Sequence, residues 1–269
     1  MADSQLAAAS IIWNGQGPVH IGSYDPARGR PELGFLVDIY SVGCGNRTLT
    51  ATPARQTTTL NESCSGQRLT LKEIETSKSL QVSLAMVQFD GRTLAQAFFG
   101  GAVVKDGGTV TSEQLAELQP GDYFFLRNPR SSSVIVQDSA AGTPITYVEG
   151  VHYEASDADH SRYRLLAHPA THVEPLTVDY EYAGYLNIAA FSKTNVEKGI
   201  IFSGLNGDGQ KVRVIIPRIS LTMSGDFGWI SDEASQLTLA GQALYVPELQ
   251  TDPDFGPFMR IDAMPDLPA

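Results

Sequence analysis

The sequence has little cysteine, little positive charge and no long apolar run. Two cysteines, Cys44 and Cys64, occur in 269 residues, which excludes a disulfide-dense secreted scaffold and a cysteine-rich zinc site. Both cysteines lie in one polar stretch, and the sequence leaves open whether they form a disulfide. The 19 Lys and Arg stand against 30 Asp and Glu, a net charge of −11. This balance argues against broad electrostatic attraction for nucleic acid or for an anionic membrane.

Segments that would direct the chain into or across a membrane are also missing from the sequence. The longest nearly apolar run, residues 94–104, contains two glycines and a glutamine. It is much shorter than the roughly 20 residues of a spanning helix. Asp3 stands where a signal peptide would be positive, and the first basic residue is Arg28. We therefore expect a soluble protein without an export signal.

Apolar residues make up 42% of the chain, enough for a substantial core. The clearest strand pattern spans residues 79–89, where Leu80, Val82, Leu84 and Met86 fall on one face. Residues 68–74 are predicted to form a shorter partner strand. From residue 122 onward, short strand patterns alternate with turn signals, as in a sandwich or barrel.

Two short helices are predicted between the strands. Asp90 or Thr93 can cap the first, and Gly100 with Gly101 ends it. The second is expected over residues 112–118, because Thr111 and Gln114 have capping-box spacing.

The fold class that we predict is mainly β, a β-sandwich or barrel with one or two short α-helices, a long polar loop and extended terminal arms. We assign residues 1–17 to an N-terminal arm, 18–246 to one β domain and 247–269 to a C-terminal arm. The long loop is expected over residues 43–66, because that stretch is rich in Thr, Ser and Asn and has few large aliphatics.

Motifs that would indicate catalysis are missing. His168 and His172 are four apart, but Pro169 makes a metal-binding helix implausible, so two solvated loop histidines are the preferred interpretation. The glycines of residues 204–209 precede a strand rather than a helix, and Asn206-Gly207-Asp208-Gly209 predicts a hairpin turn. We expect no enzymatic activity, no cofactor and no metal, although paired carboxylates of a glycosidase cannot be recognised from sequence.

Four stretches, taken in order, resemble the major tail tube proteins of long-tailed bacteriophages. They are RLTLKEIETSKSLQVSLAMVQFDGRTLAQAFFG (68–100), YVEGVHYEASDADHSRYRLLA (147–167), PLTVDYEYAG (175–184) and IIFSGLNGDGQKVRVIIPRISLTMSGDFGWISDEASQLTLAGQAL (200–244). The resemblance covers roughly residues 34–244 and rests on the order of strands, acidic turns and one short helix. Residues 101–121 do not align with the family and are expected to be an insertion.

The resemblance implies a structural virion protein that forms stacked rings, usually hexameric, around a hollow lumen through which DNA passes without specific binding. The implied partners are copies of itself and other tail proteins, such as the tape measure, tail terminator and distal tail proteins. It also implies a location in the virion tail after synthesis in the host cytoplasm, and it implies no membrane contact.

The same resemblance suggests functional residues. Polar strand faces give candidate lumen-facing residues Gln81, Ser83, Asp179 and Glu181, which could equally face solvent outside the ring. The long loop gives candidate inter-ring residues Cys44, Arg47, Arg55, Asn61 and Cys64. The terminal arms would bridge subunits.

Two alternatives remain open. One is a different virion β protein, such as a tail terminator, decoration or spike module. The other is a carbohydrate-binding β-sandwich or a carbohydrate enzyme, for which Trp13 and Trp229 are the only tryptophan platforms.

Overall fold

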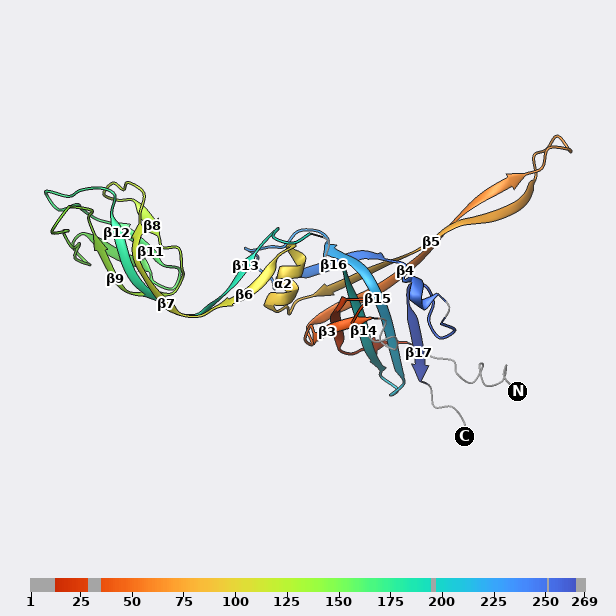
Figure 1. Cartoon of the computed structure of the whole chain (residues 1–269). Coiled ribbons are helices and arrows are strands. Elements are labelled where there is room, and N and C mark those ends of the chain that lie inside the picture. The colour runs from red at the N-terminus through yellow and green to blue at the C-terminus, as the bar shows by residue number, and fades with distance from the viewer. Residues whose placement is uncertain (1–12, 29–34, 195–196, 251, 265–269) are drawn as a thin grey trace. The chain divides into compact units, whose positions relative to one another are not determined.

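The computed structural model describes residues 13–28, 35–194, 197–250 and 252–264 (Figure 1). The fold is mainly β, built from several open antiparallel sheets and one short α-helix in the described part of the chain. The chain divides into two compact units. The large unit comprises Met1–Gly101 and Ile188–Ala269, and the small unit comprises Ala102–Asn187. The single β domain expected over residues 18–246 is thus divided in the structure. Across the described residues, no helix is long and apolar enough to cross a membrane.

One nine-stranded sheet dominates the large unit, with the order β3-β2-β14-β15-β16-β5-β4. Its strands are β1 (Gly15–Gln16), β2 (Val19–Tyr24), β3 (Leu36–Ser41), β4 (Asn46–Asn61), β5 (Thr70–Met86), β14 (Glu197–Asn206), β15 (Lys211–Met223), β16 (Leu237–Ala243) and β17 (Arg260–Met264). Strand β1 pairs with β14, and β17 pairs with the first half of β15. The predicted hairpin turn at Asn206–Gly209 is confirmed, because β14 and β15 pair on either side of it.

The core of the large unit lies on one face of this sheet. Leu80, Val82, Leu84 and Met86 of β5 are all buried there, which confirms the alternation expected for this strand. They pack with buried residues of β2, β14, β15 and β16. Burial of each large aliphatic side chain contributes about 1.5–3 kcal/mol, so this face supplies much of the stability of the unit.

Helix α2 (Gly91–Ala97) follows β5 and confirms the first predicted helix. The Asp90 carboxylate accepts hydrogen bonds from the Thr93 backbone N–H at 2.8 Å and from its hydroxyl at 2.7 Å. This cap satisfies a donor that the first turn leaves free. Ala97 joins the core of the large unit, so the helix lies on the apolar face.

The segment predicted as a C-terminal arm is integrated into the large unit over its described residues. The 3-10 helix η2 (Pro247–Leu249) buries Leu249, and Phe255 is also buried, both against Ile215 of β15. Residues 260–264 form β17 and pair with residues 211–215. Over these residues the predicted C-terminal arm is therefore part of the large sheet and its core. The cause is long-range strand pairing, which the proline-rich local sequence does not indicate.

Side-chain contacts hold β17 in place. The Asp262 carboxylate binds Arg213 at 2.6 Å and Arg260 at 2.7 Å. Desolvation acts to raise the pKa of Asp262, but hydrogen bonds from Arg260 and Arg213 outweigh it and lower the pKa.

A third arginine, Arg218, joins three elements at the point where the pairing of β14 with β15 shifts register. Arg218 donates to both Glu197 oxygens, at 2.7 and 2.8 Å, and to the Tyr245 carbonyl at 3.1 Å. Its guanidinium lies 4.9 Å from the centre of the Tyr24 ring. The contact with Glu197 raises the pKa of Arg218.

The described end of the N-terminal arm is also anchored. Gly15 and Gln16 pair with Asn206 and Leu205, and the Trp13 ring meets Phe202 edge-on at 6.4 Å. The rest of that predicted arm, residues 1–12, lies outside the described residues.

The small unit is a sandwich of two three-stranded antiparallel sheets, ordered β10-β11-β8 and β7-β12-β9. The strands are β7 (Gly108–Gln114), β8 (Tyr123–Phe125), β9 (Ser131–Gln137), β10 (Tyr153–Asp157), β11 (Arg162–Leu165) and β12 (Thr177–Tyr182). Val136, Leu165, Leu176 and Val178 are fully buried between the two sheets. Strands β6 (Gly101–Lys105) and β13 (Tyr185–Ala189) pair as a ribbon through which the chain enters and leaves. The expected insertion at 101–121 is therefore only the beginning of a longer independent unit.

Three local predictions are wrong. Residues 46–61 form strand β4 rather than part of a polar loop, because their many β-branched threonines suit an extended backbone. Residues 70–74 of the predicted partner strand belong to the same strand, β5, as the segment with which they were expected to pair. The second helix is absent, since residues 108–114 form β7 and pair with β12. Cross-strand pairing overrides the capping-box spacing there.

Candidate assembly surface

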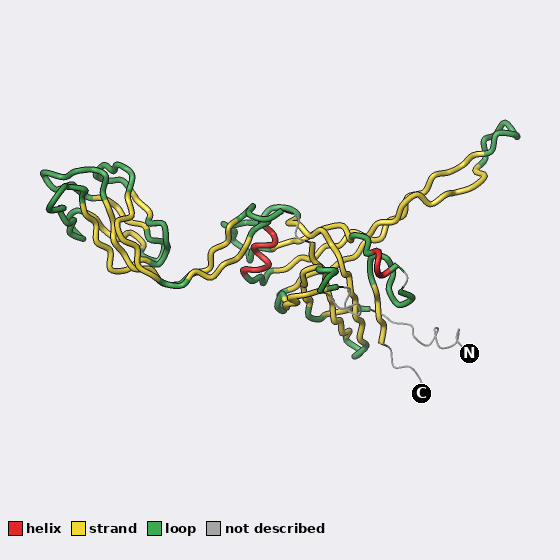
Figure 2. Tube along the Cα trace, viewed as in Figure 1, coloured by secondary structure: helices red, strands yellow, loops and turns green. Residues whose placement is uncertain are grey.

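Strands β4 and β5 form a hairpin whose outer half extends beyond the rest of its sheet (Figures 1 and 2). The two strands pair from Asn46 opposite Met86 to Asn61 opposite Thr70. Strand β16 pairs with β5 only over residues 81–86. Within the described chain, the outer half is thus a two-stranded ribbon. Such a ribbon is at best marginally stable in water without another strand or a covering layer.

Aliphatic side chains of the outer hairpin face solvent. Leu60, Leu69, Leu71 and Ile74 are 50, 56, 67 and 46% exposed. They lie near the tip of the hairpin, at the end of β4 and the beginning of β5, where the described residues provide no core to cover them. Exposed apolar side chains of this kind are typical of surfaces that bind another molecule, so the outer hairpin is a candidate binding surface.

The outer edge of β4 has no paired strand among the described residues, because β4 ends the strand order of the sheet there. Its 16 residues carry two charges, Arg47 and Arg55, and one proline, Pro53. Long edge strands with few charges readily pair with a further strand. The edge therefore offers backbone donors and acceptors to a neighbouring molecule.

The tip of the hairpin is held by a single carboxylate. Glu62 accepts hydrogen bonds from the backbone N–H groups of Cys64 at 2.6 Å, Ser65 at 2.9 Å and Leu69 at 3.4 Å. It also accepts one from the Ser65 hydroxyl. The bonds from the Ser65 hydroxyl and the Ser65 and Cys64 N–H groups lower the pKa of Glu62 to about 2. The tip is therefore an ordered turn that presents its side chains in a defined arrangement.

The candidate inter-ring residues are distributed along this hairpin and are not brought together. Cys44 precedes β4, Arg47 lies near its start, Arg55 lies at its middle, Asn61 ends it and Cys64 lies in the tip. The 16 residues of β4 separate the two cysteines. At about 3.4 Å a residue, an extended strand holds such ends roughly 50 Å apart. Both cysteines are free and exposed, so the disulfide left open by the sequence is not formed.

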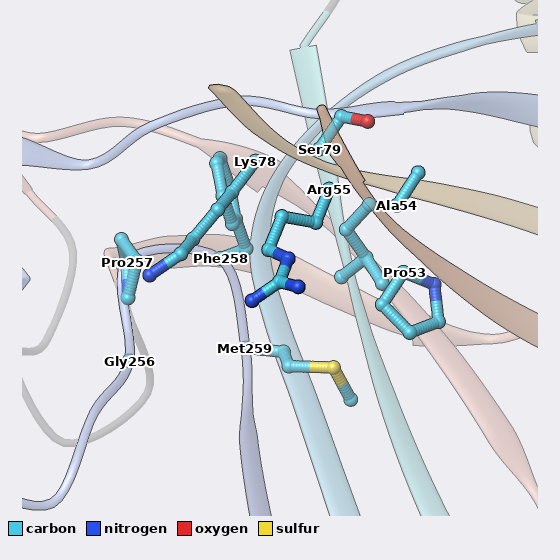
Figure 3. A pocket seen from close by; sticks show the side chains of 10 residues that line it. Pro53, Ala54, Arg55, Lys78, Ser79, Gly256, Pro257, Phe258 and Met259 are labelled. Atoms are coloured by element: carbon cyan, nitrogen blue, oxygen red, sulfur yellow. The ribbon is translucent and has the colours of Figure 1, made fainter. Parts of the chain in front are cut away.

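A cavity lies where the hairpin joins the body of the large unit (Figure 3). Its volume is about 530 Å³, and its walls are mostly apolar. Pro53, Leu80, Phe258 and Met259 line it, and the side chains of Arg55 and Lys78 reach over it towards residues 256–259. Because of this composition, the cavity suits an apolar side chain that lies beside a carboxylate.

The face of the large sheet opposite the core is polar and uncharged in two rows across β4, β5, β16 and β15, and Glu197 of β14 lies opposite Ser220 at the end of the first row. Directly opposed residues share a face, so the strand registers define two rows across β4, β5, β16 and β15. The rows are Thr52, Gln81, Gln242, Ser220 and Thr50, Ser83, Ala240, Thr222. Gln81 is exposed and Ser83 is half-buried, so the two candidate lumen residues of β5 lie in these two uncharged rows.

Asp179 and Glu181, the other two candidate lumen residues, lie in the small unit on β12. The Asp179 carboxylate accepts a hydrogen bond from the Ser112 backbone N–H at 2.6 Å, and Glu181 accepts one from the Ser133 hydroxyl at 3.5 Å. The structure therefore places the four candidates on two separate sheets in two different units.

Sequence reasoning missed the elements that define this surface. The exposed leucines and Glu62 were not singled out, although Leu69 and Leu71 show the two-residue spacing of a strand. Sequence reasoning weighed His168 and His172 as metal ligands and set them aside, and it missed Glu174: among the described residues, the three place their ligand atoms within 4.8 Å of one another.

Comparison with known proteins identifies one family. The model of a family described as "Protein of unknown function UCP028589" matches residues 12–262. No curated protein matches the chain.

Proposed function

The chain belongs to the UCP028589 family, and because that family has no assigned function, we propose from the molecule itself that this protein is a self-assembling tail tube subunit. In this proposal, copies form stacked rings, hexameric as the family resemblance implies, around a lumen that conducts phage DNA. The subunit belongs to the virion tail and is made in the host cytoplasm. The tape measure, tail terminator and distal tail proteins are its proposed partners.

The observation that carries this proposal is the hairpin of β4 and β5. It combines an open edge of 16 residues with four exposed aliphatic side chains on a two-stranded ribbon. A neighbouring copy that adds a strand to this edge would satisfy the backbone groups and cover the leucines at the same time. Repetition of the contact around a ring would leave no open edge.

The two uncharged rows on the large sheet support the proposal that the lumen conducts DNA. A lumen that conducts DNA must be hydrated and must not bind the phosphate groups tightly. The two rows that contain Gln81 and Ser83 offer hydroxyl and amide groups and no charge. The overall charge of −11 also disfavours retention of DNA. We therefore keep Gln81 and Ser83 as lumen candidates ahead of Asp179 and Glu181.

Electron microscopy of the purified full chain over a range of concentrations tests the assembly. We expect rings or tubes with a central hole that grow in number as concentration rises, and sedimentation should report the same transition. Compact monomers at every concentration would contradict self-assembly and would favour another virion role.

Carbohydrate binding is retained as a second candidate because of one feature of the small unit. A polar cavity of about 580 Å³ is lined by Tyr182 and Tyr185 together with Glu113, Arg127 and Asn128. Aromatic faces beside amide and carboxylate groups are suited to a sugar ring. Binding to a glycan array that is lost in Tyr185→Ala would support this candidate, and an array without binding would remove it.

A further inference from the structure

We propose that His168, His172 and Glu174 of the small unit form a binding site for a transition-metal ion of the zinc type. The three side chains lie in the connection between β11 and β12, and their ligand atoms are within 4.8 Å of one another. This inference is independent of tail assembly.

His168 is already oriented as a metal ligand would be. Its Nε2 atom lies 2.9 Å from the Leu118 carbonyl oxygen, which can only accept a hydrogen bond. Nε2 therefore carries a proton, and in the neutral ring the lone pair is on Nδ1. A backbone carbonyl that fixes the tautomer in this way is the usual support for a metal-binding histidine. The Tyr147 hydroxyl lies 2.9 Å from Nδ1, so binding of a metal ion at Nδ1 requires this hydroxyl to move aside.

Glu174 provides the observation that points most directly to a missing cation. One carboxylate oxygen, Oε2, accepts a hydrogen bond from the Leu176 backbone N–H at 3.0 Å. The other, Oε1, is buried and has no hydrogen-bond partner among the described residues. A buried carboxylate oxygen without a donor is costly, and a bound metal ion would remove that cost.

His172 completes the set from the solvent side. Its ring is exposed and stacks on His168, with centroids 3.8 Å apart and planes inclined by 8°. Parallel rings do not direct both lone pairs at one point, so the His172 ring must turn out of the stack when the ion binds. The ligand atoms must also approach to roughly 3.3 Å from one another, as bonds of about 2.0 Å in a tetrahedron require. An exposed side chain in a loop can make this movement easily.

The ligand types decide the class of ion. Two imidazole nitrogens and one carboxylate oxygen suit Zn²⁺, Co²⁺, Ni²⁺ or Cu²⁺ and disfavour Mg²⁺ and Ca²⁺, which prefer oxygen ligands. Three protein ligands leave the fourth position of a tetrahedron to water. Bound metal would also tie residues 168–174 together and stabilise the small unit.

Isothermal titration of the metal-free full chain with zinc chloride near neutral pH tests the site. We expect one Zn²⁺ per chain and at least a tenfold loss of affinity in His172→Ala and in Glu174→Gln. His160→Ala is the matched control, because His160 is an exposed histidine of the same unit that contacts Asp157 at 2.8 Å, and this change should leave zinc affinity unaltered.

Cobalt provides a second readout. Tetrahedral Co²⁺ absorbs visible light much more strongly than Co²⁺ in water, so the wild-type chain should develop this absorption and His172→Ala should not. Since His172 is exposed, its replacement will not unfold the protein, which circular dichroism can verify. Absence of stoichiometric zinc binding by the wild type, or equal binding by His172→Ala, would overturn the proposal.

Discussion

Replacement of Leu69 and Leu71 by serine removes about half of the apolar surface that the outer hairpin offers to a neighbour. In the free chain these side chains are 56 and 67% exposed, so the double change should leave the stability of the monomer nearly unaltered. Complete burial of a leucine contributes about 1.5–3 kcal/mol, and roughly half to two-thirds of that remains to be gained here. All four aliphatic side chains would then contribute on the order of 4 kcal/mol to each interface.

Loss of two of these four side chains should weaken each interface by about 2 kcal/mol, which corresponds to a roughly 30-fold higher concentration for assembly. Sedimentation of the assembled fraction over a concentration series measures this threshold. A matched control replaces Val148 and Val151, which are 53 and 58% exposed on the small unit, with serine. An equal threshold for the wild type, the hairpin variant and the control would refute the reasoning that the leucines are buried between copies.

Three further predictions concern the lumen, the hairpin tip and the body of the large unit. Gln81→Lys with Ser83→Lys should slow DNA ejection from assembled particles without preventing assembly, because the new charges would bind phosphate. Acidification should loosen the tip, because the low pKa of Glu62 makes its contribution complete above about pH 4.5 and lost as the pH falls towards 2. Hydrogen exchange at the Cys64 and Ser65 amides measures this. Arg218→Met should lower the free energy of unfolding in urea by about 2 kcal/mol, since it removes the paired bonds to Glu197.

Each of these three has its own control and its own contradicting result. Normal ejection kinetics in the lysine variant would remove Gln81 and Ser83 from the lumen. Glu62→Gln should show fast exchange at every pH, and slow exchange in this variant would mean that the carboxylate does not hold the tip. Lys211→Met, on the same strand as Arg218, should leave unfolding unchanged, and an equal loss in both variants would show that charge on β15 in general is responsible.

Sequence patterns within single segments correctly predicted a strand that packs on a core and elements that depend on near neighbours in the chain. The alternation in β5 predicted a buried face because the inner half of that strand does pack on a core. The cap at Asp90 and the turn at Asn206–Gly209 depend on interactions between near neighbours in the chain, so they were predicted correctly.

Predictions failed where distant parts of the chain decide the outcome. Residues 46–61 have few large aliphatics, because both faces of the outer ribbon are exposed, and this composition was taken for a loop. Residues 260–264 carry no strong strand pattern, yet β15 and the arginines around Asp262 hold them in the sheet. His168 and His172 were judged by helical spacing, whereas a loop stacks their rings and brings Glu174 beside them.

The amino-acid sequence by itself determined a mainly β protein with an acidic surface, one capped helix and an alternating central strand. These properties depend on composition and on contacts between residues close in sequence. Only the tertiary structure decided that residues 102–187 form a unit of their own, that a polar stretch becomes an exposed hairpin and that Glu174 has one oxygen without a partner among the described residues. Each of these follows from pairing or burial between segments far apart in the chain. Hydrophobic periodicity within one segment contains no information about which distant segments pair with it.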